Sequence, residues 1–339
     1  MTMRRIKYLL MLCLFLVACA SVPKRTQDPY DPQIILPENS FIEAIKIEYG
    51  QAFADCLPVA LEALFKFYGG HVDRKEISDK IQKFSGTYMT DAIVFVKLKG
   101  FNIYYFPDES QDKRWIKYYL SRQMPVLIVI GNVWSGHAAV LVGYDDSKRI
   151  FFMADPERRK IMQWHYMEFD DWHRPLGNQA FLVYPPSMQL PEISEYTKAV
   201  EKESVYAQAY AVAYNLQGLA NSKDKRYDEA ISLYRKALDI NPKFASANNN
   251  LAWLYATASE GRFWNGKKAV EHARSACELT DWKNPVYLDT LAAAYARIDD
   301  FENAIKWQEK ALEGDGRTKK ADAQQRLDLY RMRKPWPAN

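Results

Sequence analysis

Apolar residues follow different spacings along the chain, and the changes of spacing divide it into regions. An uninterrupted apolar run, Tyr8 to Ala18, stands near the start. Between residues 40 and 187, apolar residues at helical spacing come first and short apolar runs follow. From residue 188 to 332 the spacing is helical almost throughout. Helices followed by sequential strands predict an α+β domain with an antiparallel sheet, and the last region predicts an all-α domain.

The first of these domains is predicted to hold helices in its first half and strands mainly in its second. The first helix begins at Cys56 and ends at Gly69-Gly70, because glycine favours helix termination. Asp55 is a plausible N-cap for it, and Pro58 is tolerated in a first turn. The expected helices are 56–68, 73–83, 90–99 and 111–122, and the expected strands are 102–106, 125–131, 137–144, 149–155 and 179–185.

A repeat is visible in the second domain. One unit runs over 211–244, the next begins near residue 245, and a third follows Pro285. Small residues such as Ala230 and Ala237 let two antiparallel helices approach closely, and Asn-Pro steps end each hairpin. The pattern resembles the tetratricopeptide repeat, whose period is about 34 residues. Segments 194–215 and 317–332 are expected to cap the stack.

A stack of this kind presents a concave surface that usually holds a peptide or a helix of a protein partner. The resemblance therefore implies a partner-binding domain. The alternative is a rigid spacer that only presents the first domain.

The first residues of the chain have the features of a targeting segment. Arg4, Arg5 and Lys7 precede the apolar run, which is too short to span a bilayer as a mature helix. The run ends in Leu16-Val17-Ala18-Cys19, which resembles the bacterial lipobox. The resemblance implies that residues 1–18 are a lipoprotein signal peptide and that Cys19 carries lipid. The alternative is an ordinary signal peptide with a chance cysteine.

Lipidation implies a membrane-anchored protein in the bacterial cell envelope, because two or more acyl chains give stable anchoring. The polar, proline-rich segment 19–39 is expected to be the tether. Ala20 stands after the cysteine, and by resemblance the absence of aspartate there favours the outer membrane, facing the periplasm.

Charge and composition limit the kinds of partner and cofactor that we expect the protein to bind. The net charge is +4, from 46 basic and 42 acidic residues without a long run of either, so no nucleic-acid partner is expected. The histidines have no metal-ligand spacing with the cysteines, and we expect neither a metal nor another cofactor. Cys56 and Cys277 could pair, although a free Cys56 is favoured by its position, and Cys277 is expected to pack between helices.

Three residues of the first domain have the types and positions of a catalytic triad. Cys56 stands at a helix start, where free N–H groups and the helix dipole stabilise a thiolate. His137 opens one predicted strand and Asp155 ends the next, so the two side chains can lie side by side. The carboxylate can then orient the imidazole, and the imidazole can take the thiol proton. Gln51 could direct its amide toward a developing oxyanion.

These residues and their surroundings resemble a known family: the papain-like peptidases that remove double-glycine leaders from bacteriocins, in the variant found on bacterial lipoproteins. The matched segments are Gln51, Asp55-Cys56, the helix to Gly69, His137 to Asp145, Ala154 to Pro156 and the tail over 167–186. The resemblance implies hydrolysis of peptide bonds, with Cys56 as nucleophile, His137 as general base and acid, Asp155 as its orienter and Gln51 as oxyanion donor.

Other functions remain open. Leu57 stands where the family usually has glycine, and Gln51 lies one residue closer to the cysteine than is usual. Both differences favour an alternative, a catalytically inactive lipoprotein that serves as an interaction scaffold. A transglutaminase or amidase is a weaker third hypothesis, because these enzymes also use Cys, His and Asp in this order. The chain has no GxxxxGK[ST] motif, so a role in bacteriocin export is not supported.

Overall fold

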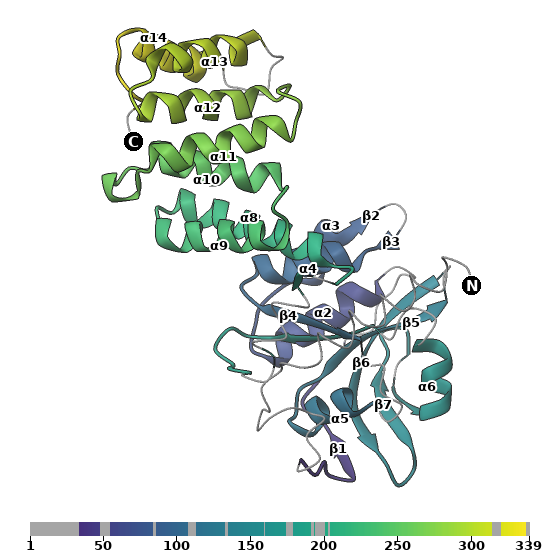
Figure 1. The fold of residues 1–339 in the computed structure, drawn as a ribbon. Helices are drawn as coiled ribbons and strands as arrows, with labels where there is room; N and C mark the ends of the chain where they lie inside the picture. Colours follow the sequence, from purple (N-terminus) through teal and green to yellow (C-terminus); the bar gives the residue numbers. More distant parts are fainter. Residues whose placement is uncertain are drawn as a thin grey trace, which may run out of the picture.

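The structure, a computed structural model, combines a sheet domain with a stack of helices (Figure 1). The described residues are 34–47, 55–83, 86–107, 113–132, 135–158, 160–173, 179–190, 193, 201–202, 204–313 and 320–336. A papain-like α+β domain spans residues 39–184, and the helical repeat region spans 207–331. The fold class predicted from the sequence is therefore confirmed.

The sheet domain is built on a seven-stranded sheet whose pairings are all antiparallel. Its strands run in the order β4 (Asn102–Pro107), β9 (Gln179–Tyr184), β5 (Val126–Asn132), β6 (Ser135–Asp145), β7 (Ile150–Ala154) and β8 (Ile161–His165). The short strand β1 (Asn39–Phe41) pairs with the far end of β6, and β2 (Gln82–Lys83) and β3 (Gly86–Thr87) form a separate ribbon.

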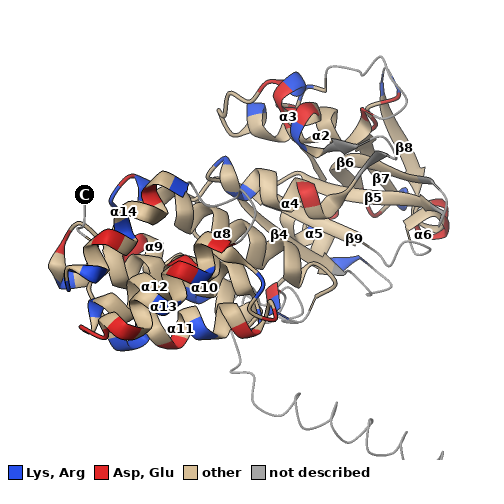
Figure 2. Ribbon diagram, turned by 90° about the horizontal axis from the view of Figure 1, so that it is seen from above, with Lys and Arg blue, Asp and Glu red and all other residues tan. Residues whose placement is uncertain are grey.

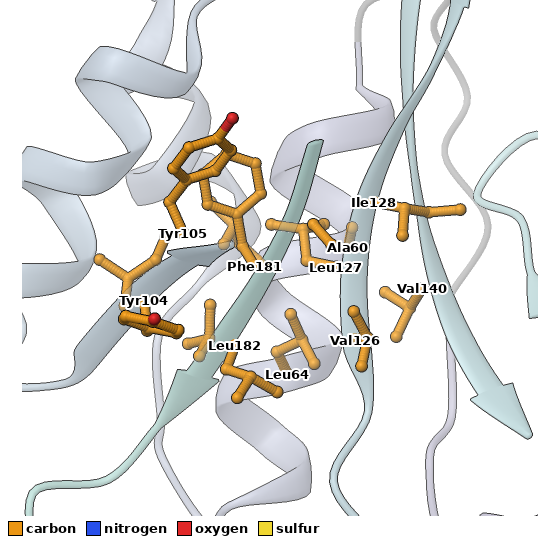
Figure 3. Packing of buried hydrophobic residues seen from close by; sticks show 14 of the residues in the cluster. Ala60, Leu64, Tyr104, Tyr105, Val126, Leu127, Ile128, Val140, Phe181 and Leu182 are labelled. Atoms are coloured by element: carbon orange, nitrogen blue, oxygen red, sulfur yellow. The ribbon is translucent and has the colours of Figure 1, made fainter. Parts of the chain in front are cut away.

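Among the described residues of this domain, five helices accompany the sheet: α2 (Cys56–Phe67), α3 (Arg74–Ile81), α4 (Met89–Leu98), α5 (Arg114–Ser121) and α6 (Tyr166–His173). Figure 3 shows Ala60 and Leu64 of α2 against the side chains of the central strands. The two residues are one helical turn apart, so they share the face that packs on the sheet. Leu127 of β5 lies opposite Phe181 of β9 in the ladder, and both are fully buried.

Several helices and strands of the structure differ from those that the sequence predicts. β8 and α6 were missed because both are half-exposed: only Phe169 and His173 of α6 are buried. The helix expected over 73–83 ends at Ile81 and gives way to β2. Asp55 stands at the N-cap of α2, but its side chain makes no capping hydrogen bond, since its backbone is not in the extended conformation that capping requires.

In the part of the chain that the structure describes, the repeat region contains three antiparallel pairs of α-helices and one further α-helix. The pairs are α8 (Ala207–Lys223) with α9 (Tyr227–Ile240), α10 (Ala245–Thr257) with α11 (Gly266–Glu278), and α12 (Pro285–Arg297) with α13 (Phe301–Glu313). The last helix, α14 (Lys320–Arg331), packs against α13 as the predicted C-terminal cap. The N-terminal cap was expected over 194–215, but residues 207–215 belong to α8 and so to the first pair.

The hydrophobic core of the sheet domain continues into the first helix pair of the repeats, whereas the later helices form clusters of their own. Tyr210 and Ala209 of α8 belong to the same cluster of buried residues as the strands of the sheet. The Tyr210 hydroxyl accepts a hydrogen bond from the Tyr105 N–H and donates one to the Ile103 carbonyl, each at 3.3 Å. These backbone groups lie on the outer edge of β4, so the first repeat covers a sheet edge that would otherwise invite strand pairing.

The distribution of charged residues and the length of the apolar helices are relevant to what surrounds the protein. Lys and Arg are interspersed with Asp and Glu over the helices of the repeats (Figure 2). Among the helices that the structure describes, none is long and apolar enough to cross a membrane.

Candidate active site

The first component of the site is Cys56, the first residue of α2. Residues Leu57 to Phe65 of this helix are buried, which fixes the helix against the sheet and holds its first turn in place. Cys56 itself is only partly buried and is a free cysteine. An accessible thiol at a helix N-terminus is placed where the N–H groups of the first turn favour a negative sulfur.

The second component is a pair of residues at neighbouring strand ends. His137 lies near the start of β6 and Asp155 directly follows β7. His137 Nε2 is 2.8 Å from Asp155 Oδ1, so the predicted contact between the two side chains is present. Cys56 lies near the same ring, since its interaction with the imidazole contributes to raising the pKa of His137. Because Nε2 faces Asp155, Nδ1 is the ring nitrogen left for the thiol.

The charges in this site favour a protonated imidazole. Burial alone would lower the pKa of His137, but its hydrogen bonds with Asp155 and Cys56, and their negative charges, raise it to about 10. Burial would raise the pKa of Asp155, yet its hydrogen bonds with His137 and with the Glu157 N–H bring the pKa below its ordinary value. At neutral pH the site therefore holds a carboxylate, an imidazolium and a sulfur that can carry a negative charge.

A fourth residue, Glu157, was missed by the sequence analysis. Its backbone N–H donates to Asp155 Oδ1 at 2.8 Å, the same oxygen that contacts His137. Its carboxylate Oε1 lies 3.7 Å from His137 Nδ1. Nothing in the sequence distinguishes this glutamate from other surface acids, because its proximity depends on the turn that follows Asp155.

The other residues singled out from the sequence lie either outside the described residues or in the hydrophobic core. Gln51, the oxyanion candidate, and Cys19, the lipidation candidate, lie outside the described residues. Leu57 is buried in the hydrophobic core, so its bulk is accommodated by packing. Cys277 is buried and free, and therefore packs between helices as expected. Within the described residues, no group of three His, Cys, Asp or Glu side chains could hold a metal ion.

The fold and this arrangement of cysteine, histidine and aspartate are those of a papain-like cysteine peptidase domain. Comparison with known families agrees with that class. Residues 42–181 match the Peptidase_C39 like family, and residues 211–244 and 287–315 match tetratricopeptide repeat profiles. The chain thus carries a Peptidase_C39-like domain followed by tetratricopeptide repeats.

Individual proteins resemble one or other part of the chain. One is the anaphase-promoting complex subunit 3 of Schizosaccharomyces pombe, 22% identical over 52% of this chain. The match spans only 28% of that protein's length. The chain is similar to a double-glycine-motif protease of an AMS/PCAT transporter, solved with the leader peptide, at TM-score 0.34 and 13% identity over 43% of this chain and 94% of that one. It is also similar to the first tetratricopeptide repeat domain of Spaghetti bound to an HSP90 peptide, at TM-score 0.32 and 23% identity over 37% of this chain and 93% of that one.

Proposed function

We propose that the protein is a lipid-anchored cysteine peptidase of the bacterial envelope, with Cys56, His137 and Asp155 as its triad. The observation that carries the proposal is the 2.8 Å contact between His137 Nε2 and Asp155 Oδ1, with Cys56 near enough to the same ring to raise the pKa of His137. This arrangement provides a nucleophile, a general base and acid, and a carboxylate that orients the base. The transglutaminase and amidase alternatives use the same three residue types and differ in the acceptor or substrate.

The proposed reaction begins from the thiolate and imidazolium. The Cys56 sulfur attacks the carbonyl carbon of the scissile bond, and the carbonyl oxygen becomes an oxyanion. In the proposal Gln51 donates a hydrogen bond to that oxyanion. As the C–N bond breaks, the leaving amine takes the proton from His137 Nδ1 and a thioester remains on Cys56. Water then attacks the thioester, gives a proton to Nδ1 and releases the acid and the Cys56 thiolate.

Asp155 supports this cycle without exchanging a proton itself. Its carboxylate holds the Nε2–H side of the ring in place, which leaves Nδ1 as the nitrogen that exchanges the proton in the proposed steps. Its lowered pKa keeps it ionised, which stabilises the imidazolium of the resting site.

The location of this activity is part of the proposal. Residues 1–18 would be removed as a signal peptide, and Cys19 would carry the lipid that anchors the protein to the outer membrane, facing the periplasm. Replacing Cys19 by Ser should abolish palmitate incorporation and release the protein into the soluble periplasmic fraction. Retention of label in this variant would contradict the anchor. Fractionation of the wild-type protein with the inner membrane would contradict the outer-membrane assignment.

The repeats are proposed to bind a protein partner or the substrate itself. The support is the matched tetratricopeptide profiles over 211–244 and 287–315, since such repeats commonly present a concave surface to a peptide or helix. Crosslinking of the full-length protein carrying Cys56→Ala, followed by identification of captured proteins, tests this role. Capture that is unchanged when the exposed concave-face residues are replaced would contradict it.

One experiment separates the peptidase from the inactive scaffold. Alkylation of Cys56 by iodoacetamide at neutral pH should be fast in the wild type and slower by roughly tenfold or more in His137→Ala, because the imidazolium that stabilises the thiolate is lost. The matched control is His71→Ala, which replaces an exposed histidine. Equal and slow alkylation of wild type and His137→Ala would favour the scaffold.

A further inference from the structure

The Glu157 carboxylate occupies a position that the triad itself does not require. Asp155 already orients the imidazole from the Nε2 side, whereas Glu157 Oε1 lies 3.7 Å from Nδ1, on the side of the reacting nitrogen. The Glu157 side chain is 46% exposed, against 20% for His137 and 9% for Asp155. It therefore lies where the site opens to solvent, and an approaching substrate can reach it.

The backbone of Glu157 is tied to the triad. Its N–H donates to Asp155 Oδ1 at 2.8 Å, and the next N–H, of Arg158, donates to the Asp155 carbonyl at 3.0 Å. These two bonds form a tight turn directly after β7, so the position of residue 157 relative to the imidazole is fixed by the backbone. The backbone therefore places the Glu157 carboxylate within reach of Nδ1 without any movement of the turn.

This position has a consequence for the leaving group. In the proposed reaction the leaving nitrogen must come within about 3.2 Å of Nδ1 to take its proton. Since Glu157 Oε1 is 3.7 Å from the same atom, the leaving nitrogen and the carboxylate are no more than roughly 7 Å apart. Groups on the leaving side of the scissile bond therefore approach a negative charge. The nearest described cation along the chain is Arg158, whose charge acts on Asp155.

We infer that Glu157 is a specificity-determining residue that selects substrates with a positive charge on the leaving side, such as a lysine or arginine directly after the scissile bond. The inference rests on the proposed peptidase function of the Cys56 site. The chemistry is charge complementarity: a cationic side chain or a newly formed ammonium is attracted, and an acidic residue in the same place is repelled.

The first test measures the charge felt at Cys56 without any substrate. Methanethiosulfonate reagents form a mixed disulfide with a thiolate and release methanesulfinate, and they exist with an ethylammonium or an ethylsulfonate group. The ratio of the two rate constants at Cys56 should be higher in the wild type than in Glu157→Gln. For unscreened charges roughly 7 Å apart in water, the ratio should fall by about sevenfold, and by less as salt is added.

Two matched variants make this result specific. Glu157→Asp keeps the charge and should keep a ratio closer to that of the wild type. Glu43→Gln removes an exposed carboxylate from the turn after β1 and should leave the ratio unchanged. Equal ratios in the wild type and Glu157→Gln would overturn the inference. So would an equal fall in Glu43→Gln, because the effect would then reflect net charge alone.

The second test uses internally quenched peptides that carry Gly-Gly before the scissile bond and lysine, norleucine or glutamate after it. The wild type should cleave the lysine peptide with the highest kcat/KM, and Glu157→Gln should bring the three values close together. Cleavage without such a preference in the wild type would overturn the inference. If no peptide is cleaved while the reagent ratio still falls in Glu157→Gln, the peptidase proposal fails and the negative potential from Glu157 at Cys56 stands.

Discussion

The Lys97 ammonium lies 3.1 Å from the Glu201 carboxylate, and this pair links α4 of the sheet domain to the segment that precedes the repeats. Both side chains are less than one-tenth exposed. The Tyr214 hydroxyl of α8 donates to Glu201 Oε1 at 2.7 Å and accepts from Lys97 at 3.1 Å. A buried charge pair with this third partner ties α8 to α4 at the junction of the two domains.

We predict that removing one charge of this pair is costly. Lys97→Met leaves Glu201 buried without its cation, which should lower the free energy of unfolding by about 3–5 kcal/mol. The double variant Lys97→Met/Glu201→Leu removes both charges and should recover most of that loss. Urea unfolding followed by circular dichroism measures both. The control is Lys75→Met, which breaks an exposed pair with Asp79 and should barely change the midpoint. A double variant as unstable as the single one would contradict the prediction.

A second prediction concerns Asp155 and the protonation of the site. In Asp155→Asn the negative charge beside Nε2 is lost, so the pKa of His137 should fall from about 10 toward its ordinary value. The imidazolium would then lose its proton at lower pH. The NMR titration of the His137 ring protons measures this shift directly.

Activity should change in the same direction. The alkaline limb of the kcat/KM profile should move to lower pH in Asp155→Asn, and the maximal rate should fall by roughly a hundredfold, since a misoriented ring transfers protons poorly. A His137 pKa that stays near 10 in this variant would show that Cys56 alone maintains the imidazolium.

The third prediction is an acid-sensitive step in stability at His173. This residue is buried, its Nε2–H donates to the Gln179 carbonyl at 3.0 Å, and its ring packs on Phe169. Burial lowers the pKa of His173 from 6.5 to about 4. A depressed folded pKa means that stability is fully present above about pH 6.5 and is lost as the pH falls toward 4, because the unfolded chain binds the proton first.

The loss at His173 should reach a few kcal/mol at most over that interval. Urea unfolding at several pH values tests it, with the pH slope compared between the wild type and His173→Gln. The variant lowers stability at every pH by removing packing, so the slope and not the absolute value decides. A slope that is equal in both proteins between pH 6.5 and 4 would contradict the prediction.

The parts of the site that the sequence predicts are those fixed by position at the ends of secondary structure. Cys56 starts a strongly apolar helix, His137 lies near the start of one apolar strand, and Asp155 follows the end of the next. Local patterns were therefore enough to predict that these three side chains lie together. Glu157 was not predictable, because a turn of two hydrogen bonds places it and no periodicity marks such a turn.

The same contrast holds for the fold. The central strands are apolar runs and were predicted close to their observed bounds, and the repeats were recognised from the spacing of their alanines. β8 and α6 bury few side chains, and their sequences therefore resemble loops. The junction was also not predictable. Lys97 lies near the end of an ordinary helix, and only contact with Glu201, 104 residues later, makes it a buried charge.

The last prediction concerns Gly143 of β6, at the point where β1 pairs with this strand. Gly143 lies opposite Phe41 in the ladder, next to an irregularity in the pairing of β6 with β7. A Cβ added at this glycine would lie 2.3 Å from the Ser40 carbonyl oxygen, a backbone atom that can move only with its strand. Gly143→Ala should therefore displace β1 and break the hydrogen bond from the Ile42 N–H to the Val142 carbonyl, which is 2.7 Å long in the native structure.

The expected cost of Gly143→Ala is about 1–3 kcal/mol in the free energy of unfolding, the range typical of overpacking at a buried position. Hydrogen exchange at the Ile42 amide should accelerate, since its acceptor is drawn away from it. Gly261→Ala serves as the control, because a Cβ there meets only Trp264 at ordinary contact distances of 3.5 Å or more. Unchanged exchange at Ile42 in Gly143→Ala would contradict the prediction, because the close approach at Ser40 would then not be what requires glycine at this position.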